Sequence, residues 1–161
     1  MLPSILVLGL AAVAALLLTL NRRSPPELAA ERSSAARMLL LALVIQSIHF
    51  AEETVTGFHE RFPGLFGLPE IPFYGFVAFN LAWIGIWLVS VPGLRSAHSA
   101  AFFASWFLAI AGMVNGIAHP VLALADGSYF PGLVTSPFIA LACVFLWQRL
   151  RQATIYTAHT A

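Results

Sequence analysis

One short segment of this chain combines a histidine with two glutamates. His49, Glu52 and Glu53 follow shortly after the apolar run 38–45, with no proline or glycine between them. On a helix, residues three and four positions apart lie on the same side, so the three side chains would share one face, which Gln46 extends by one turn. An ionisable side chain on a membrane helix is costly and is by default a candidate for function.

Further polar residues should reach the same layer from other helices. Asn115 and His119 are four residues apart in a second apolar stretch, and Thr135 follows a Pro-Gly pair shortly before a third. If the helices alternate in direction at about 1.5 Å per residue, these groups lie in the same half of the membrane. The expected lining of a substrate pocket there is Gln46, Asn80, Tyr129 and Thr135.

The elements that must position these residues are membrane helices. Of the 161 residues, 60% are hydrophobic and only 9% are charged, and the mean hydropathy is +0.86. These values lie far from those of soluble domains. A net charge of +1 provides no basic surface for nucleic acid, and the single Cys143 allows no internal disulfide.

The apolar runs predict an all-α, polytopic bundle of five transmembrane helices. We expect an N-terminal helix within 1–20, a cytoplasmic loop over 21–37, a four-helix domain over 38–147 and a cytoplasmic tail over 148–161. Within the four-helix domain, prolines and glycines limit the helices to about 37–56, 73–91, 100–119 and 131–147. An aromatic loop in the membrane interface should join the first two of these four.

The arginines predict the orientation. All eight basic residues are arginines, and seven of them fall in segments that share one side if the chain crosses five times. Because basic residues concentrate on the cytoplasmic side, the N-terminus should lie outside and the C-terminus in the cytoplasm. Arg61 alone would lie opposite. We expect a bacterial inner (plasma) membrane location.

Between about Met38 and Leu146 the chain resembles the HXXEE family of membrane proteins. Three motifs occur in order: His49-Phe50-Ala51-Glu52-Glu53, then Asn115 to His119, then Tyr129-Phe130-Pro131-Gly132-Leu133-Val134-Thr135. The resemblance implies a membrane-embedded active site at these motifs. It does not specify the reaction.

A metal site is the first chemical hypothesis. Catalytic zinc is often held by two histidines and one glutamate, with water in the fourth position. His49, Glu53 and His119 could supply that set for a zinc-like divalent metal, with Glu52 as general base and Asn115 orienting a ligand. The expected function is a hydrolase or lyase acting on a lipid-like or isoprenoid substrate.

Three other readings of the same residues stay open. Two adjacent carboxylates in low dielectric favour one protonated member, which could protonate an olefin in a metal-free isoprenoid cyclase or isomerase. The carboxylates could instead titrate in a proton-coupled carrier, or they could only join helices, although such bonds stabilise membrane proteins by only about 0.6–2 kcal/mol. His59 and Asp126 are expected in a solvated loop and a turn rather than in the site. The chain has no phosphate loop, serine triad order or Cys-x-x-Cys motif.

Overall fold

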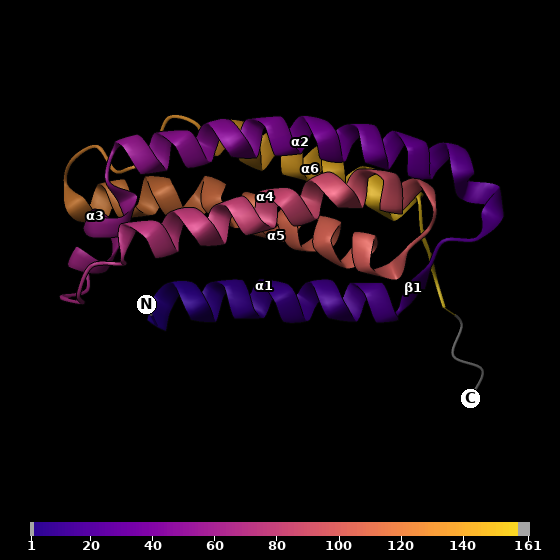
Figure 1. Cartoon of the computed structure of the whole chain (residues 1–161), viewed down its shortest axis with the longest axis horizontal. Coiled ribbons are helices and arrows are strands. Elements are labelled where there is room, and N and C mark those ends of the chain that lie inside the picture. Colours follow the sequence, from indigo (N-terminus) through magenta and orange to yellow (C-terminus); the bar gives the residue numbers. More distant parts are fainter. Residues whose placement is uncertain (1, 158–161) are drawn as a thin grey trace.

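Long apolar helices lie side by side along one axis (Figure 1). The computed structural model describes residues 2–157, with side chains from Leu6 onward. Within this part, the α-helices are α1 (Leu2–Leu20), α2 (Ala29–Val55), α3 (Phe58–Gly64), α4 (Phe73–Arg95), α5 (Ser99–Asp126) and α6 (Ser136–Gln152). A 3-10 turn, η1 (Pro26–Leu28), precedes α2. The all-α fold class is confirmed, with one small addition at the chain ends.

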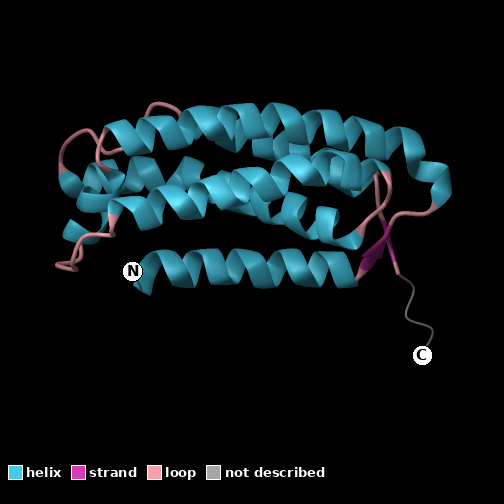
Figure 2. Cartoon of the chain, in the orientation of Figure 1, coloured by secondary structure: helices cyan, strands magenta, loops and turns pink. Residues whose placement is uncertain are grey.

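That addition is a two-stranded antiparallel ribbon (Figure 2). Strand β1 (Arg22–Arg23) pairs with β2 (Ile155–Tyr156), so that Arg22 lies opposite Tyr156. The ribbon joins the segment after α1 to the segment after α6. The expected tail over 148–161 is therefore helical or paired as far as Tyr156, and residues 158–161 lie outside the described residues.

Helix α5 is the centre of the bundle and packs against α1, α4 and α6, while α2 packs against α4 and α6. The contact between α5 and α6 is close because α5 carries two glycines. A Cβ on Gly112 would lie 2.3 Å from Cys143 Sγ, and one on Gly116 would lie 2.3 Å from Ala140 Cβ. Small residues at such positions let membrane helices approach each other.

The close approach gives a testable expectation for Gly116→Ala. The new methyl group would have to push α6 away, so we expect a loss of about 1–3 kcal/mol in the free energy of unfolding. Gly85→Ala on α4 is the matched control, because nothing lies within 4 Å of its Cβ position. It should be neutral or stabilising, since alanine favours helix. Unfolding in mixed detergent measures the free energy of unfolding of both variants. Equal stability of the two would contradict the packing argument.

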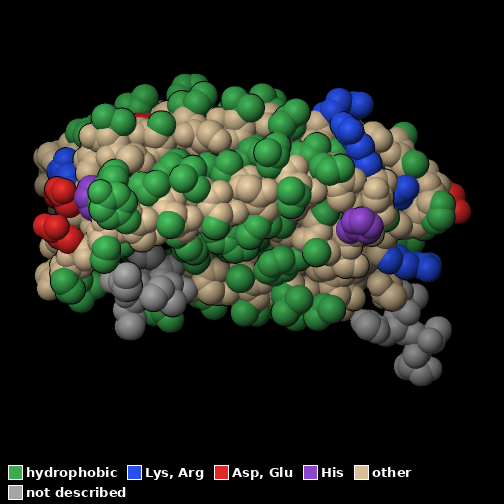
Figure 3. Space-filling view, in the orientation of Figure 1, with side chains coloured by type: hydrophobic (Ala, Val, Ile, Leu, Met, Phe, Trp, Pro, Cys, Tyr) green, Lys and Arg blue, Asp and Glu red, His purple; other side chains and the backbone are tan. Residues whose placement is uncertain are grey.

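The dimensions and surface of the bundle indicate an integral membrane protein. Three helical segments are long and apolar enough to cross a bilayer, namely Pro26–Val55, Phe73–Arg95 and Ser99–Asp126. Large hydrophobic side chains cover the visible middle of the bundle, while arginine side chains gather mainly at the end near β1 (Figure 3). The apolar helix Leu6–Leu20 and the 17-residue α6 are shorter. The count of five crossings therefore stays a prediction.

The segment 21–37 was expected to be a loop with a short surface helix at most, but its second half is the first part of the long helix α2. Helix α2 begins at Ala29 and continues through the polar segment. Ala35 and Ala36 are fully buried and Arg32 is 7% exposed, so this first part of α2 packs against the bundle despite its polarity. Tertiary packing thus makes residues 29–37 part of a helix, although their sequence alone favoured a loop.

Other helix boundaries also differ from the expected ones. Helix α5 was expected to stop before Pro120 but continues to Asp126, since a proline in a membrane helix removes one donor without ending the helix. Helix α6 starts at Ser136 rather than near Pro131, because Gly132 has φ +84°, which an α-helix cannot contain. The predicted interfacial loop after α2 contains the short helix α3.

Candidate metal centre

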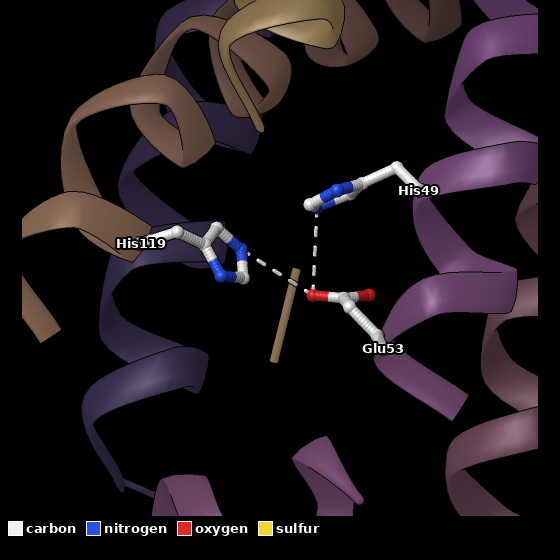
Figure 4. Close-up of side chains that lie close together, drawn as sticks. All are labelled: His49, Glu53 and His119. Atoms are coloured by element: carbon white, nitrogen blue, oxygen red, sulfur yellow. Dashed lines mark ion pairs between the residues drawn. The ribbon is translucent and has the colours of Figure 1, made fainter. Parts of the chain in front are cut away.

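Three buried side chains meet near the end of the bundle that carries α3 (Figure 4). His49 and Glu53 come from the last two turns of α2, and His119 comes from α5. Their exposed fractions are 0%, 7% and 2%. Glu53 Oε1 lies 3.6 Å from His49 Nε2 and 3.4 Å from His119 Nε2. The predicted convergence of these three residues is confirmed.

The hydrogen bond of His119 fixes which ring nitrogen carries its proton. Nδ1 lies 2.6 Å from the carbonyl oxygen of Pro131. A carbonyl can only accept, so Nδ1 must be the donor. In the neutral ring, Nε2 then has a lone pair, and this nitrogen is the one that faces Glu53.

His49 is fixed in the same way through Thr135. The hydroxyl of Thr135 has one proton and donates it to Oε2 of Glu52. It must therefore accept from His49 Nδ1, which lies 2.7 Å away. His49 Nε2 is left with a lone pair, and Asn115 Nδ2 lies 3.3 Å from it. Both imidazoles thus turn an acceptor nitrogen towards one carboxylate.

The spacing of these three acceptors suits a cation between them. Separations of 3.4 and 3.6 Å are longer than a normal nitrogen–oxygen hydrogen bond. Ligands about 2.05 Å from zinc in tetrahedral geometry lie about 3.3 Å apart. The three ligand atoms all lie within 4.8 Å of one another, so the group could hold a metal ion.

Glu52 does not point into the group of His49, Glu53 and His119 but binds the turns before α6. It was predicted as a general base, but it accepts from Tyr129 Oη at 2.5 Å, Val134 N at 3.0 Å and Thr135 N at 2.8 Å, besides the Thr135 hydroxyl. Four donors therefore occupy its two oxygens. Glu52 ties the end of α2 to the turns over 129–135 that precede α6.

Tyr129 is a stable donor in this arrangement. Burial raises the pKa of its phenol, and the hydrogen bond to the carboxylate of Glu52 raises it further. Both effects disfavour the phenolate. Tyr129 therefore contributes to the turn over 129–135 as a neutral hydroxyl, and it reaches the histidines only through Glu52 and Thr135.

Gly132 closes the site against both imidazoles. A Cβ at this position would lie 2.6 Å from His119 Cε1 and 2.9 Å from His49 Cε1. Its φ of +84° is in the region that favours glycine. Sequence reasoning placed Gly132 at this level of the membrane without a role. The preceding proline and the left-handed turn it suggests were the available signal.

The other residues that were predicted to line a pocket differ in whether they contact the three clustered side chains. Gln46 is 7% exposed and lies one turn before His49 on α2. Asn80 donates to the Phe76 carbonyl of its own helix α4 at 2.9 Å. Asn115 and Thr135 contact His49 directly. Of the residues predicted to line a pocket, Thr135 is thus the one that forms a hydrogen bond with His49.

His59 and Asp126 belong to other contacts. The expectation of a solvated loop is wrong for His59, which lies in the short helix α3 with a side chain that is 13% exposed and with Nε2 3.2 Å from Glu60 Oε1. Asp126 pairs with Arg61, which also donates to Ser128 Oγ at 2.8 Å. Asp126 ends α5 before Gly127, whose φ is +69°, so its expected place at a turn is confirmed. The ion pair joins α3 to this turn beside the candidate centre.

Aromatic rings enclose one side of the centre. Phe58 and Phe130 have ring centroids 5.8 and 6.1 Å from that of His119. The two phenyl rings also contact each other edge to face, with centroids 6.0 Å apart. The side of the centre formed by these rings is therefore apolar, which strengthens the interaction of the nearby acceptors with any cation.

No protein-family model, curated protein or solved structure matches this chain.

Proposed function

We propose that this protein is a membrane-embedded metalloenzyme, with a zinc-like divalent ion held by His49, Glu53 and His119. The observation that carries the proposal is the orientation of both imidazoles. Each donates its Nδ1 proton outward and turns its Nε2 towards Glu53. Histidines that bind metals are held in this manner by acceptors behind them.

A zinc-like ion held by His49, Glu53 and His119 would supply a water molecule activated near neutral pH. This chemistry suits a hydrolase or lyase. Asn115 contacts the same His49 nitrogen that would bind the ion, so metal binding would release its amide to hold a substrate. Glu52 has the role of a positioning residue in this proposal, because its oxygens are occupied by the turn over 129–135.

A lipid-like or isoprenoid substrate is supported by the location of the centre. The ligands lie inside an apolar bundle and against Phe58 and Phe130. We further propose five crossings with the N-terminus outside, which puts the arginine-rich end in the cytoplasm and the centre in the outer half of the membrane. We also propose that the chain is an HXXEE protein, because its three motifs supply the residues of this centre.

A second candidate is metal-free acid and base catalysis on an isoprenoid. The observation in its favour is the pair of phenyl rings beside His119, since aromatic faces stabilise carbocations. The two candidates differ in their need for metal. Elemental analysis of the purified protein separates them.

The reaction is tested by comparing lipid extracts of cells that produce the wild type or His119→Ala. The proposal expects that only in cells with the wild type does one lipid decrease while its cleaved product accumulates. It also expects near-stoichiometric metal only in the purified wild type. Chelation should abolish the conversion in membranes, and added zinc should restore it. A metal-free wild type that converts the lipid fully would exclude the metalloenzyme and leave the second candidate.

Thr135→Val removes the hydroxyl between Glu52 and His49 at nearly constant volume. His49 then loses the acceptor that holds its Nδ1 proton, so we expect zinc affinity to fall by about 10- to 100-fold. Isothermal titration calorimetry of the purified protein with zinc measures this affinity. Thr135→Ser keeps the hydroxyl and should bind nearly as the wild type does, whereas equal affinity in the valine variant would show that the hydroxyl does not orient His49.

A further inference from the structure

A polar cavity lies at the opposite end of the bundle from the candidate metal centre. It has a volume of about 240 Å³ and lies between the end of α1, β1, the start of α5 and the segment after α6. The polar residues among those that line it include Arg22, Arg23, Ser24, Ser99, Trp106 and Thr154. Among the residues that the structure describes, no carboxylate lines this cavity.

The positive charge around this cavity has only neutral partners in the described part of the chain. Arg22 donates to Thr154 Oγ1 at 2.7 Å and to the Thr154 carbonyl at 2.9 Å. Arg32, which is 7% exposed, donates to Pro25 O at 2.7 Å and to Ser24 Oγ, so a buried guanidinium also lies behind the cavity wall. Among residues 2–157, neither Arg22, Arg23 nor Arg32 forms an ion pair. An anion would complement this charge.

Two donors point to the same class of ligand. Trp106 is fully buried, and its indole Nε1–H has no acceptor in the described structure. A buried polar group without a partner is rare in native structures and needs a specific explanation, and Trp106 is among the residues that line the cavity. Ser99 is the first residue of the 28-residue α5, whose N-terminal end favours negative charge.

An apolar groove adjoins the cavity. It has a volume of about 280 Å³ and is lined by Ala12, Val13, Leu16 and Phe103. On α1, Leu16 of the groove is three residues before Thr19 of the cavity, and on α5, Phe103 is four residues after Ser99. These spacings place groove and cavity on the same faces of two helices that pack together. The groove therefore leads from the cavity towards the middle of the bundle.

We propose that the seam between α1 and α5 binds a phospholipid, with the phosphate in the arginine cavity and an acyl chain in the apolar groove. Arginine side chains, the indole N–H and the start of α5 bind the phosphate. Aliphatic side chains of α1 and the ring of Phe103 contact the chain. This site is independent of the metal centre and does not depend on its chemistry.

The test measures binding of three probes to the full chain purified in a non-ionic detergent. The probes are phosphatidylglycerol, diacylglycerol, which lacks the phosphate, and glycerol 3-phosphate, which lacks the chains. We expect phosphatidylglycerol to bind at least about tenfold more tightly than either of the others. Arg23→Gln and Trp106→Phe should each weaken phosphatidylglycerol binding by about tenfold, whereas zinc binding should not change.

Arg149→Gln is the matched control, because Arg149 is exposed on α6, bonds Gln152 and does not line the cavity. It should bind phosphatidylglycerol as the wild type does. Equal binding in Arg23→Gln, Trp106→Phe and the wild type would overturn the site. Glycerol 3-phosphate binding as tightly as the lipid would overturn the lipid as its occupant.

Discussion

Glu53→Gln is expected to lower the zinc affinity of the purified protein by about 100- to 1,000-fold. Structural zinc sites bind with about 10–16 kcal/mol shared among four ligands, so one ligand accounts for about 3–4 kcal/mol. Each 1.4 kcal/mol is a factor of about ten in affinity. The glutamine keeps the shape of the side chain and one oxygen, so the loss reports the missing negative charge.

The same variant should leave the metal-free protein as stable as before, or more stable. Without an ion, the carboxylate of Glu53 faces the acceptor Nε2 atoms of His49 and His119 in a buried site. A glutamine amide can donate to one of these nitrogens and removes a buried charge. If Glu53 instead paired with a protonated histidine, its neutralisation would destabilise the protein by about 3–5 kcal/mol.

Zinc titration and detergent unfolding of the metal-free protein measure the two effects. Glu60→Gln is the control, because Glu60 is exposed and contacts His59 rather than the centre. It should change neither quantity. High zinc affinity retained in Glu53→Gln, or a large loss of metal-free stability, would remove Glu53 from the proposed ligand set.

The sequence predicted the convergence of His49, Glu53 and His119 because their spacing follows the helix period. His49 and Glu53 are one turn apart on α2, and Asn115 and His119 are one turn apart on α5, so each pair shares a face. Helices α2 and α5 do not pack directly against each other, but both faces point into the interior that α4 and α6 complete. The convergence needed only the knowledge that both helices run in the same direction.

The role of Glu52 could not be predicted from the same spacing. Adjacent helical residues differ by about 100° around the axis, so Glu52 and Glu53 point to different neighbours. Glu53 faces α5, and Glu52 faces the turns before α6. Those turns are built from main-chain groups of Pro131, Val134 and Thr135, whose positions a residue pattern does not encode.

Helix ends show the same limit. Hydropathy located the apolar core of each helix, but it could not show that Ala35 and Ala36 pack well enough to extend α2 into a polar segment. It also overestimated the effect of Pro120 on α5. Local signals predict helix existence, whereas tertiary contacts decide where a helix begins and ends.

Gly132→Ala is expected to impair both the fold and the metal centre. The alanine Cβ would lie 2.6 Å from His119 Cε1, 2.8 Å from His119 Nδ1 and 2.9 Å from His49 Cε1. Both rings would have to move, and with them the hydrogen bond from His119 to the Pro131 carbonyl. We expect a loss of about 1–3 kcal/mol from the clash, a further loss of about 1–2 kcal/mol from the left-handed backbone, and zinc affinity at least about tenfold lower.

Gly127→Ala separates the two causes. Gly127 has φ +69° and nothing within 4 Å of its Cβ position, so alanine there is strained without meeting another atom. Its unfolding free energy should fall by about 1–2 kcal/mol, and its zinc affinity should equal that of the wild type. The difference between the two variants then measures the contact of Gly132 with the imidazoles. Because that contact exists only if both rings lie against the turn before α6, equal stability and equal zinc affinity in the two variants would show that the imidazoles are not held there.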